Sequence, residues 1–209
     1  MIILKHLLNA KYVLWFVLSI PAWPFIIDFF MQELYSAEAM YRTGVISVQL
    51  LVFTLAITPV TQLLKRWVYG YSKTKIIIGW LLQRRRNFGV ASFVYAVIHT
   101  MLYLIETGEF DIVWQEAMTI EYGFGWIAFV VMLPLALTSN NTSMKRLGKR
   151  WKQLQQLVYV LVVVTFIHWF GFGFFVESGV FWLSLIIVAK LVQLYCIYQP
   201  MRKSEKVEN

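Results

Sequence analysis

Hydrophobic residues gather into six long runs along the chain, and charged residues gather between the runs. The runs cover residues 11–30, 44–64, 88–105, 122–139, 157–176 and 179–198. Each run is close to the roughly 20 apolar residues that a helix needs to cross the hydrocarbon core of a bilayer. Backbone polar groups in lipid must be paired within helices or closed barrels. The pattern therefore predicts an all-α polytopic membrane protein, a bundle of six transmembrane helices.

Lysine and arginine lie on one side of these six predicted helices. The bases of that side are Lys5, Lys11, Lys65, Arg66, Lys73, Lys75, Arg84, Arg85, Arg86, Lys145, Arg146, Lys149, Arg150, Lys152, Arg202, Lys203 and Lys206. The loops of the opposite side hold acidic residues, with Arg42 as their only base. Because Lys and Arg accumulate in cytoplasmic loops, both termini are predicted to be cytoplasmic.

The composition is typical of a membrane protein, and the lengths of the connections leave no space for a soluble domain. The 209 residues are 59% hydrophobic and 14% charged, and the mean hydropathy is +0.64. The longest connection, residues 65–87, is too short for a soluble domain, so we expect one integral membrane domain over residues 1–209. The net charge of +8 follows from basic loops at the inner leaflet and does not indicate nucleic-acid binding. No nucleotide-binding motif is present.

Two histidines are among the few polar side chains deep inside the predicted spans. His99 lies about 11 residues past the start of the third span, and His168 lies about 11 residues past the start of the fifth. At 1.5 Å per residue both are roughly 16 Å from the inner boundary, near the middle of a hydrocarbon core about 30 Å thick. Both helices are predicted to run outward, so the two imidazoles are expected to share a depth and to be able to face each other.

Two imidazoles at one depth favour a shared metal centre, and haem is a common centre inside a helical bundle. Small and aromatic residues follow the faces of both histidines: Ser92, Tyr95, Ala96 and Tyr103 near the first, and Val164, Thr165, Gly171 and Phe172 near the second. Two other interpretations stay open. Each histidine can instead make a hydrogen bond between helices, or the chain can be a transporter, although no acidic residue lies deep in a span.

Four stretches of sequence carry a resemblance to a known family. They are TGVISVQLLVFTLAITPV, RRRNFGVASFVYAVIHTMLYL, GWIAFVVMLPLALTSNN and RLGKRWKQLQQLVY, the last of them followed by His168. In this order and with these gaps they resemble the MsrQ/YedZ family of haem-binding membrane subunits, part of the ferric reductase-like transmembrane group. The resemblance places a ferric reductase-like core at about residues 43–176.

The resemblance implies one central b-type haem with His99 and His168 as axial ligands. It also implies a cytochrome of the bacterial inner membrane that takes electrons from the quinone pool or a cytoplasmic flavin donor and passes them to a periplasmic, molybdenum-containing methionine sulfoxide reductase. The chain is then an electron-transfer subunit of an oxidoreductase, and FMN is a further possible cofactor. Two other functions stay open: a haem-dependent reductase of ferric iron or other metals, and a haem-free transporter or assembly protein.

Gln155 departs from the family pattern, which carries a histidine there as a further candidate haem ligand. A carboxamide is a poor ligand for iron, and the 13 residues from Gln155 to His168 correspond to about 20 Å of helix. The departure leaves the central pair intact and weakens the case for a second haem. Arg84, Arg85 and Arg86 are candidates for contacts with a haem propionate or a flavin phosphate, although basic residues at an inner helix end first indicate topology.

Overall fold

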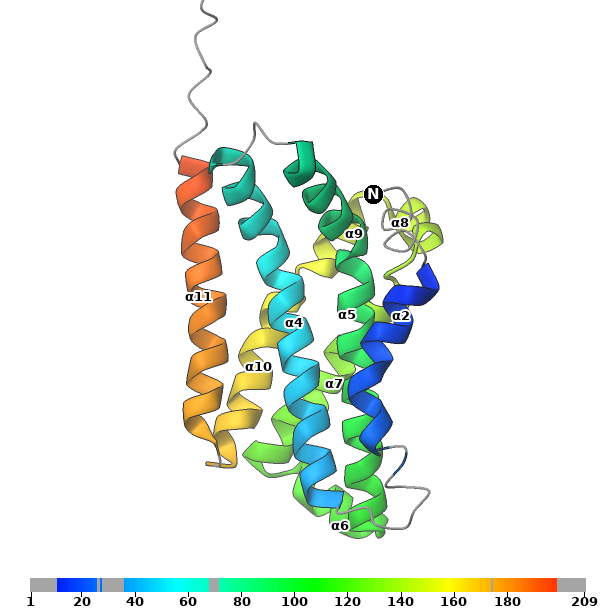
Figure 1. Cartoon of the computed structure of the whole chain (residues 1–209). Helices are drawn as coiled ribbons and strands as arrows, with labels where there is room; N and C mark the ends of the chain where they lie inside the picture. Colours follow the sequence, from blue (N-terminus) through cyan, green and yellow to red (C-terminus); the bar gives the residue numbers. More distant parts are fainter. Residues whose placement is uncertain (1–10, 26, 28–35, 68–71, 174, 199–209) are drawn as a thin grey trace, which may run out of the picture.

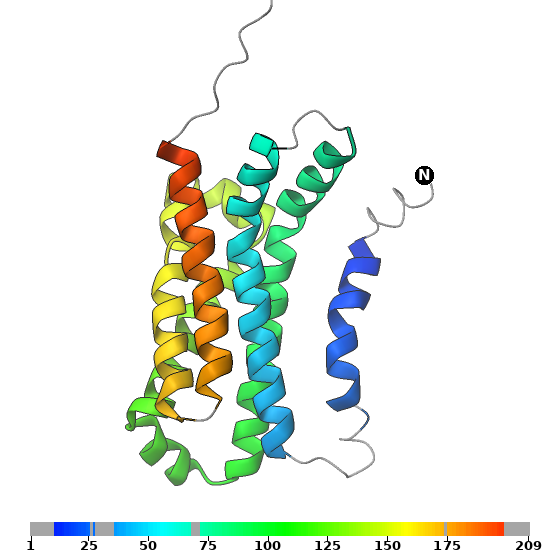
Figure 2. The same cartoon turned by 60° about the vertical axis from the view of Figure 1, so that its left-hand side comes forward.

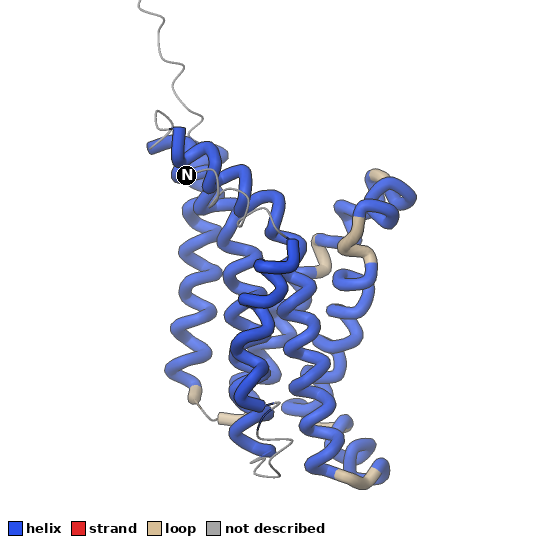
Figure 3. The backbone as a smooth tube through the Cα atoms, turned by 45° about the vertical axis from the view of Figure 1, so that its right-hand side comes forward, coloured by secondary structure: helices blue, strands red, loops and turns tan. Residues whose placement is uncertain are grey.

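Helices are the only regular elements in the part of the chain that the computed structural model describes, residues 11–25, 27, 36–67, 72–173 and 175–198 (Figures 1 and 3). Five helical segments there are long and apolar enough to cross a membrane. They are α4 (Ser36–Trp67), α5 (Ser72–Thr107), α7 (Ile120–Leu137), the segment Lys149–Gly171 formed by α9 (Lys149–Gln155) and α10 (Val158–Gly171), and α11 (Val176–Tyr198). The prediction of an all-helical, multi-pass membrane protein is confirmed.

The first predicted span, residues 11–30, is described only in part. Here α2 (Lys11–Ser19) is followed by a 3-10 turn, η1 (Ile20–Ala22), and the apolar helical stretch Tyr12–Phe25 is shorter than the roughly 17 to 25 residues of a membrane-spanning helix. Residues 28–30 lie outside the described residues. The count of six spans and the cytoplasmic termini therefore stay predictions.

Helices α4 and α5 are longer than the hydrophobic pattern predicted. Helix α5 begins at Ser72 rather than at residue 88, so most of the loop expected at residues 65–87 is helical. Arg, Lys, Gln and Leu are good helix formers, and a helix does not have to end where the apolar run ends. The end of the bundle that carries these basic segments is called the inner end below, and the opposite end the outer end.

Four helices, α4, α7, α10 and α11, supply the buried side chains of the main hydrophobic core (Figures 1 and 2), and Phe93 and Ala96 of α5 pack against it. Its buried members are Val48, Leu51, Val52 and Leu55 of α4, Ala128, Met132 and Leu135 of α7, Leu161, Val162, Val164, Phe166 and Trp169 of α10, and Ile186 of α11. Other apolar side chains of α11, such as Val180 and Leu191, are more than half exposed. That outward apolar surface is what a lipid-facing helix requires, because lipid tails are as apolar as the side chains.

Helices α4 and α5 are held together by a reciprocal pair of serines. Ser47 Oγ donates to the carbonyl oxygen of Ser92, Ser92 Oγ donates to the carbonyl oxygen of Ser47, and both distances are 2.8 Å. Ser92 is completely buried, and such small side chains let two helix backbones approach closely. This contact sets the register of α4 against α5, and it thereby places the outer segments of both helices next to each other.

Candidate functional site

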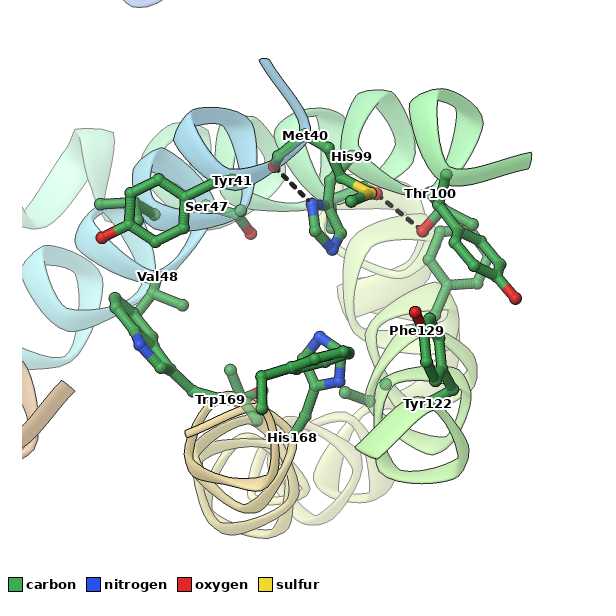
Figure 4. A pocket seen from close by; sticks show the side chains of 18 of the residues that line it. Met40, Tyr41, Ser47, Val48, His99, Thr100, Tyr122, Phe129, His168 and Trp169 are labelled. Atoms are coloured by element: carbon green, nitrogen blue, oxygen red, sulfur yellow. Dashed lines mark hydrogen bonds between the residues drawn. The ribbon is translucent and has the colours of Figure 1, made fainter. Parts of the chain in front are cut away.

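A cavity of about 490 Å³ lies between α4, α5, α7 and α10 (Figure 4). Its lining residues include Ala37, Met40 and Phe172, so it lies toward the outer end of the bundle. Its volume falls within the roughly 300 to 1,000 Å³ that is usual for small-molecule and cofactor sites. Apolar and aromatic side chains form most of its wall, among them Tyr41, Val48, Trp126, Phe129 and Met132. The cavity is therefore a mostly apolar chamber with a small number of polar groups.

His99 of α5 and His168 of α10 extend into this cavity from opposite walls. Their ring centroids are 6.2 Å apart, and the ring planes make an angle of 81°. Figure 4 shows a nitrogen of each ring directed at the other ring across open space. Among the described residues, no group of three or more His, Cys, Asp or Glu side chains comes together as a metal site, so this pair is the arrangement that needs explanation.

Each imidazole is fixed by a backbone carbonyl of the neighbouring helix. His99 Nδ1 lies 2.7 Å from the carbonyl oxygen of Met40 on α4, and His168 Nδ1 lies 2.6 Å from that of Glu121 on α7. A carbonyl oxygen can only accept, so each Nδ1 must carry the hydrogen and donate it. In a neutral imidazole the other nitrogen, Nε2, then has a free lone pair. Histidine ligands of metals are usually oriented in this way by a second, outer hydrogen bond.

The distance between the two rings suits a single metal ion between them. Two imidazoles that held one metal ion from opposite sides would have ring centroids about 6.2 to 6.4 Å apart, from a metal–nitrogen bond of about 2.0 to 2.1 Å and roughly 1.1 Å from each nitrogen to its ring centre. The observed separation is 6.2 Å. Trp169 lines the same cavity and is buried, and its Nε1 has no hydrogen-bond partner among the described residues. A buried donor without a partner suits a ligand that brings an acceptor group.

Aromatic side chains line the outer end of the cavity. The ring of Phe172 lies 5.3 Å from that of His168 and 5.1 Å from that of Tyr122, which lies 5.3 Å from Tyr103. Tyr103 Oη donates a hydrogen bond of 2.7 Å to Glu116 Oε2 on α6 (Phe110–Ala117). The cavity is thus joined by a continuous row of rings to the short outer helix α6.

The structure brings together only some of the residues expected around the histidines. Ala96, Tyr103, Thr165 and Phe172 line the cavity, whereas Ser92, Tyr95, Val164 and Gly171 do not. Tyr95, for example, donates to the carbonyl oxygen of Leu18 on α2. His168 also lies only three residues before the end of α10 at Gly171, so the site is nearer the outer end than the predicted midplane.

Sequence reasoning missed the groups that orient the imidazoles. These are the carbonyls of Met40 and Glu121, together with Gly44 and Gly125, which lie against the two rings. No side-chain pattern points to a backbone carbonyl as a partner. The glycines near the predicted outer ends of two spans are a visible signal, but their pairing with particular histidines depends on which helices are neighbours.

The three arginines lie at a distance from the histidine pair. Arg86 precedes His99 by 13 residues, or about 20 Å of helix, and none of the three lines the cavity. Arg85 Nη1 donates to Thr58 Oγ1 at 3.0 Å, and Arg86 Nη2 donates to Asn141 Oδ1 at 2.7 Å. Contact between these arginines and a haem propionate stays a prediction, and so does a flavin phosphate at the inner end.

Gln155 holds the inner end of α7. Its Nε2 lies 3.2 Å from the carbonyl oxygen of Leu135 and 3.2 Å from Thr138 Oγ1. Nearby, Trp151 Nε1 donates to the carbonyl oxygen of Thr138 at 3.0 Å. The carbonyls at a helix C-terminus lack partners within the helix, and the carboxamide of Gln155 donates a hydrogen bond to one of them. At the position where the family pattern has a candidate haem ligand, this chain therefore has a hydrogen-bond donor to α7.

Replacing Gln155 with alanine is expected to lower stability without affecting the histidine site. Two hydrogen bonds of ordinary length are lost, which together cost about 1 to 2 kcal/mol. Thermal unfolding in detergent measures the loss, and the absorbance of any bound chromophore should be unchanged. The exposed neighbour Gln156 provides the control, because its replacement by alanine should change neither quantity. A chromophore lost from the Gln155 variant alone would contradict this assignment.

Comparison with known proteins identifies the family. The family model described as "Ferric reductase like transmembrane component" matches residues 43–166. A protein of Herminiimonas arsenicoxydans is 32% identical over 170 residues, which are 78% of this chain and 72% of that protein. A protein of Rhizobium meliloti is 33% identical over 162 residues, 74% of this chain and 67% of that protein.

Both of these relatives are named protein-methionine-sulfoxide reductase heme-binding subunit MsrQ, as is a protein of Ralstonia nicotianae that is 34% identical over 131 residues, 61% of this chain and 55% of its own length. No solved structure matches the chain. The match of the family model covers more than half of the 209 residues, and it includes His99. The chain belongs to the ferric reductase-like transmembrane family and, within it, to the MsrQ proteins.

Proposed function

We propose that this chain is a b-type membrane cytochrome that carries electrons across the bacterial inner membrane to a periplasmic methionine sulfoxide reductase. One observation carries the proposal. The Nε2 atoms of His99 and His168 face a common space, with Nδ1 of each ring bonded to a carbonyl and with ring centroids 6.2 Å apart. The interpretation that the histidines only link helices explains the carbonyl contacts, but it leaves the shared cavity without a role.

Each part of the cavity has a distinct task in this proposal. A haem bound there would supply a site for reversible one-electron transfer. His99 and His168 would hold its iron, and the carbonyls of Met40 and Glu121 keep both rings in the required tautomer and orientation. The apolar wall excludes water, and Trp169 Nε1 is available to an acceptor group of the ligand. The chain's own residues would thus bind the haem, orient its ligands and separate it from water.

The relatives' name supplies the partner. Each is the heme-binding subunit of a protein-methionine-sulfoxide reductase, so we propose that the acceptor is a reductase of this kind, with molybdenum as its metal, at the outer face. The cavity lies toward the outer end of the bundle, next to α6. Electrons would enter from the quinone pool or from a flavin donor at the inner end, and FMN is a further cofactor at that end.

The test is the spectrum and haem content of the purified protein. Protein made in haem-replete cells and isolated in detergent should yield one haem b per chain in a pyridine haemochrome assay, with a reduced-minus-oxidised difference spectrum of a low-spin cytochrome. After reduction with dithionite and removal of excess reductant, the reductase that works with this chain should reoxidise it. A well-folded preparation without haem absorbance would overturn the proposal.

A second function, reduction of a metal ion, is favoured by the description of the matching family model, a ferric reductase-like component. The same haem would then deliver electrons to a ferric chelate at the outer face. Membranes that contain the chain without any partner reductase distinguish the two functions. Rapid reoxidation of the haem by a ferric chelate would favour metal reduction. Slow reoxidation by the chelate, followed by fast reoxidation once the reductase is added, would favour methionine repair.

A further inference from the structure

The two histidines are presented by the same arrangement, which occurs twice in the bundle. His99 of α5 donates to the carbonyl of Met40 on α4, and four residues after Met40 comes Gly44. His168 of α10 donates to the carbonyl of Glu121 on α7, and four residues after Glu121 comes Gly125. Residues four apart lie on one face of a helix, one above the other. Each imidazole therefore meets a carbonyl and a glycine on the same stripe of its neighbouring helix.

Both glycines are in contact with the rings: a Cβ atom has no room at Gly125, and at Gly44 it would fit only if the ring of His99 moved by a few tenths of an ångström. A Cβ atom at Gly125 would lie 2.8 Å from Cε1 and 2.8 Å from Nδ1 of His168, and a Cβ atom at Gly44 would lie 3.0 Å from Nδ1 and 3.1 Å from Cε1 of His99. Non-bonded carbon atoms prefer about 3.5 to 4.0 Å. A methyl group at either position would thus push the ring away from the neighbouring helix.

The direction of that push determines its chemical effect. The ring atoms nearest to each glycine include Nδ1, the atom that donates to the carbonyl. A ring displaced from the glycine stretches the Nδ1–carbonyl hydrogen bond and moves Nε2 within the cavity. Such outer hydrogen bonds fix the tautomer of a ligating histidine and raise its basicity, and axial ligation with hydrogen bonding tunes the potential of a haem.

We propose that Gly44 and Gly125 are positioning residues, which together with the carbonyls of Met40 and Glu121 set the orientation and basicity of the two axial imidazoles and thereby the redox potential of the haem. This inference rests on the proposed haem site. It adds that glycine is favoured at these two positions because the imidazole lies where a side chain would begin.

Substitution by alanine should give graded effects. Gly125→Ala, with the closer contacts, should shift the haem midpoint potential to more positive values and should lower haem content several-fold. Gly44→Ala should retain the haem and shift the potential less, in the same direction. The sign follows because a weaker hydrogen bond makes the imidazole a poorer electron donor to iron, which favours the ferrous form. The EPR spectrum of the ferric protein should change in both variants as the angle between the rings changes.

Gly89 offers a matched control within the same bundle. It lies on α5, and a Cβ atom there would meet only Thr54 Cγ2 at 3.7 Å, an ordinary contact. Gly89→Ala should therefore keep the potential, the EPR spectrum and the haem content of the unmodified protein. Thermal unfolding of all variants separates a local effect from a general loss of structure, and Gly44→Ala carries the test if Gly125→Ala does not fold.

Two failures can be told apart. An unmodified protein that folds without haem overturns the proposed function. An unmodified protein with haem, whose potential and EPR spectrum are the same in Gly44→Ala, Gly125→Ala and Gly89→Ala, leaves the cytochrome in place and overturns the role of the two glycines. A potential that shifts equally in all three variants also overturns it, because the effect would then be one of helix packing.

Discussion

Replacing His168 with alanine is expected to remove the haem from the purified protein, and replacing His99 should do the same. Each substitution deletes one of the two nitrogens that face the cavity. Loss of an outer hydrogen-bond partner alone costs a metal site about 10- to 100-fold in affinity, and loss of the ligand itself should cost at least as much. Haem content per chain, measured by pyridine haemochrome, should fall by at least about 10-fold in both variants.

The control for this result is chemical rescue. Imidazole added during preparation of a His168→Gly variant should occupy the vacated space and restore part of the absorbance, which it could not do if the substitution had unfolded the chain. Full haem content in either alanine variant, with an unchanged spectrum, would show that the two histidines are not both ligands. That outcome would favour the interpretation in which they only link helices.

Replacing Ser92 with leucine is expected to destabilise the protein strongly. Ser92 is completely buried, and its hydroxyl and carbonyl groups both bond to Ser47 on α4. Insertion of a larger side chain into a packed site costs about 1 to 3 kcal/mol, and a hydrogen bond between membrane helices is worth about 0.6 kcal/mol on average. We expect a loss of about 2 to 4 kcal/mol in unfolding free energy, measured by titration with a denaturing detergent.

The same substitution at Ser184 provides the comparison. Ser184 is exposed on α11, and its hydroxyl donates only to the carbonyl of Phe181 within the same helix. Ser184→Leu should change the unfolding free energy by no more than about 0.5 kcal/mol. Equal stability of the Ser92 and Ser184 variants would contradict the close packing of α4 and α5. Because α4 also carries Met40 and Gly44, the Ser92 variant should lose haem as well.

Helix length shows how far a hydrophobic pattern can be taken. The apolar run at residues 88–105 marks the part of α5 that can lie in lipid, but the helix itself begins at Ser72. The pattern reports which residues avoid water, whereas the helix continues for as long as its backbone hydrogen bonds and residue propensities allow. For this reason five of the six predicted spans could be located from the pattern, and the ends of their helices could not.

The candidate site was also predicted only in part. The matched depth of His99 and His168 follows from counting residues along two helices that run in the same direction, and the observed ring separation of 6.2 Å agrees with the expectation that they face each other. Their position near the outer ends of α4 and α7 was not predicted. It results from α10 ending at Gly171, three residues after His168, and from α5 beginning at Ser72, well before its apolar run, at the inner end.

The sequence by itself indicated a membrane environment, an all-helical fold, the family, and His99 and His168 as the candidate site. It could do so because hydrophobicity, charge and residue spacing are properties of a single chain. Only the tertiary structure decided which carbonyl holds each imidazole, which ring lies against Gly44 and Gly125, and what Gln155 bonds at the end of α7. The physical reason is that these are contacts between helices distant in sequence. Backbone carbonyls carry no residue identity, and the space that a glycine leaves acquires a meaning only when the neighbouring helix fills it.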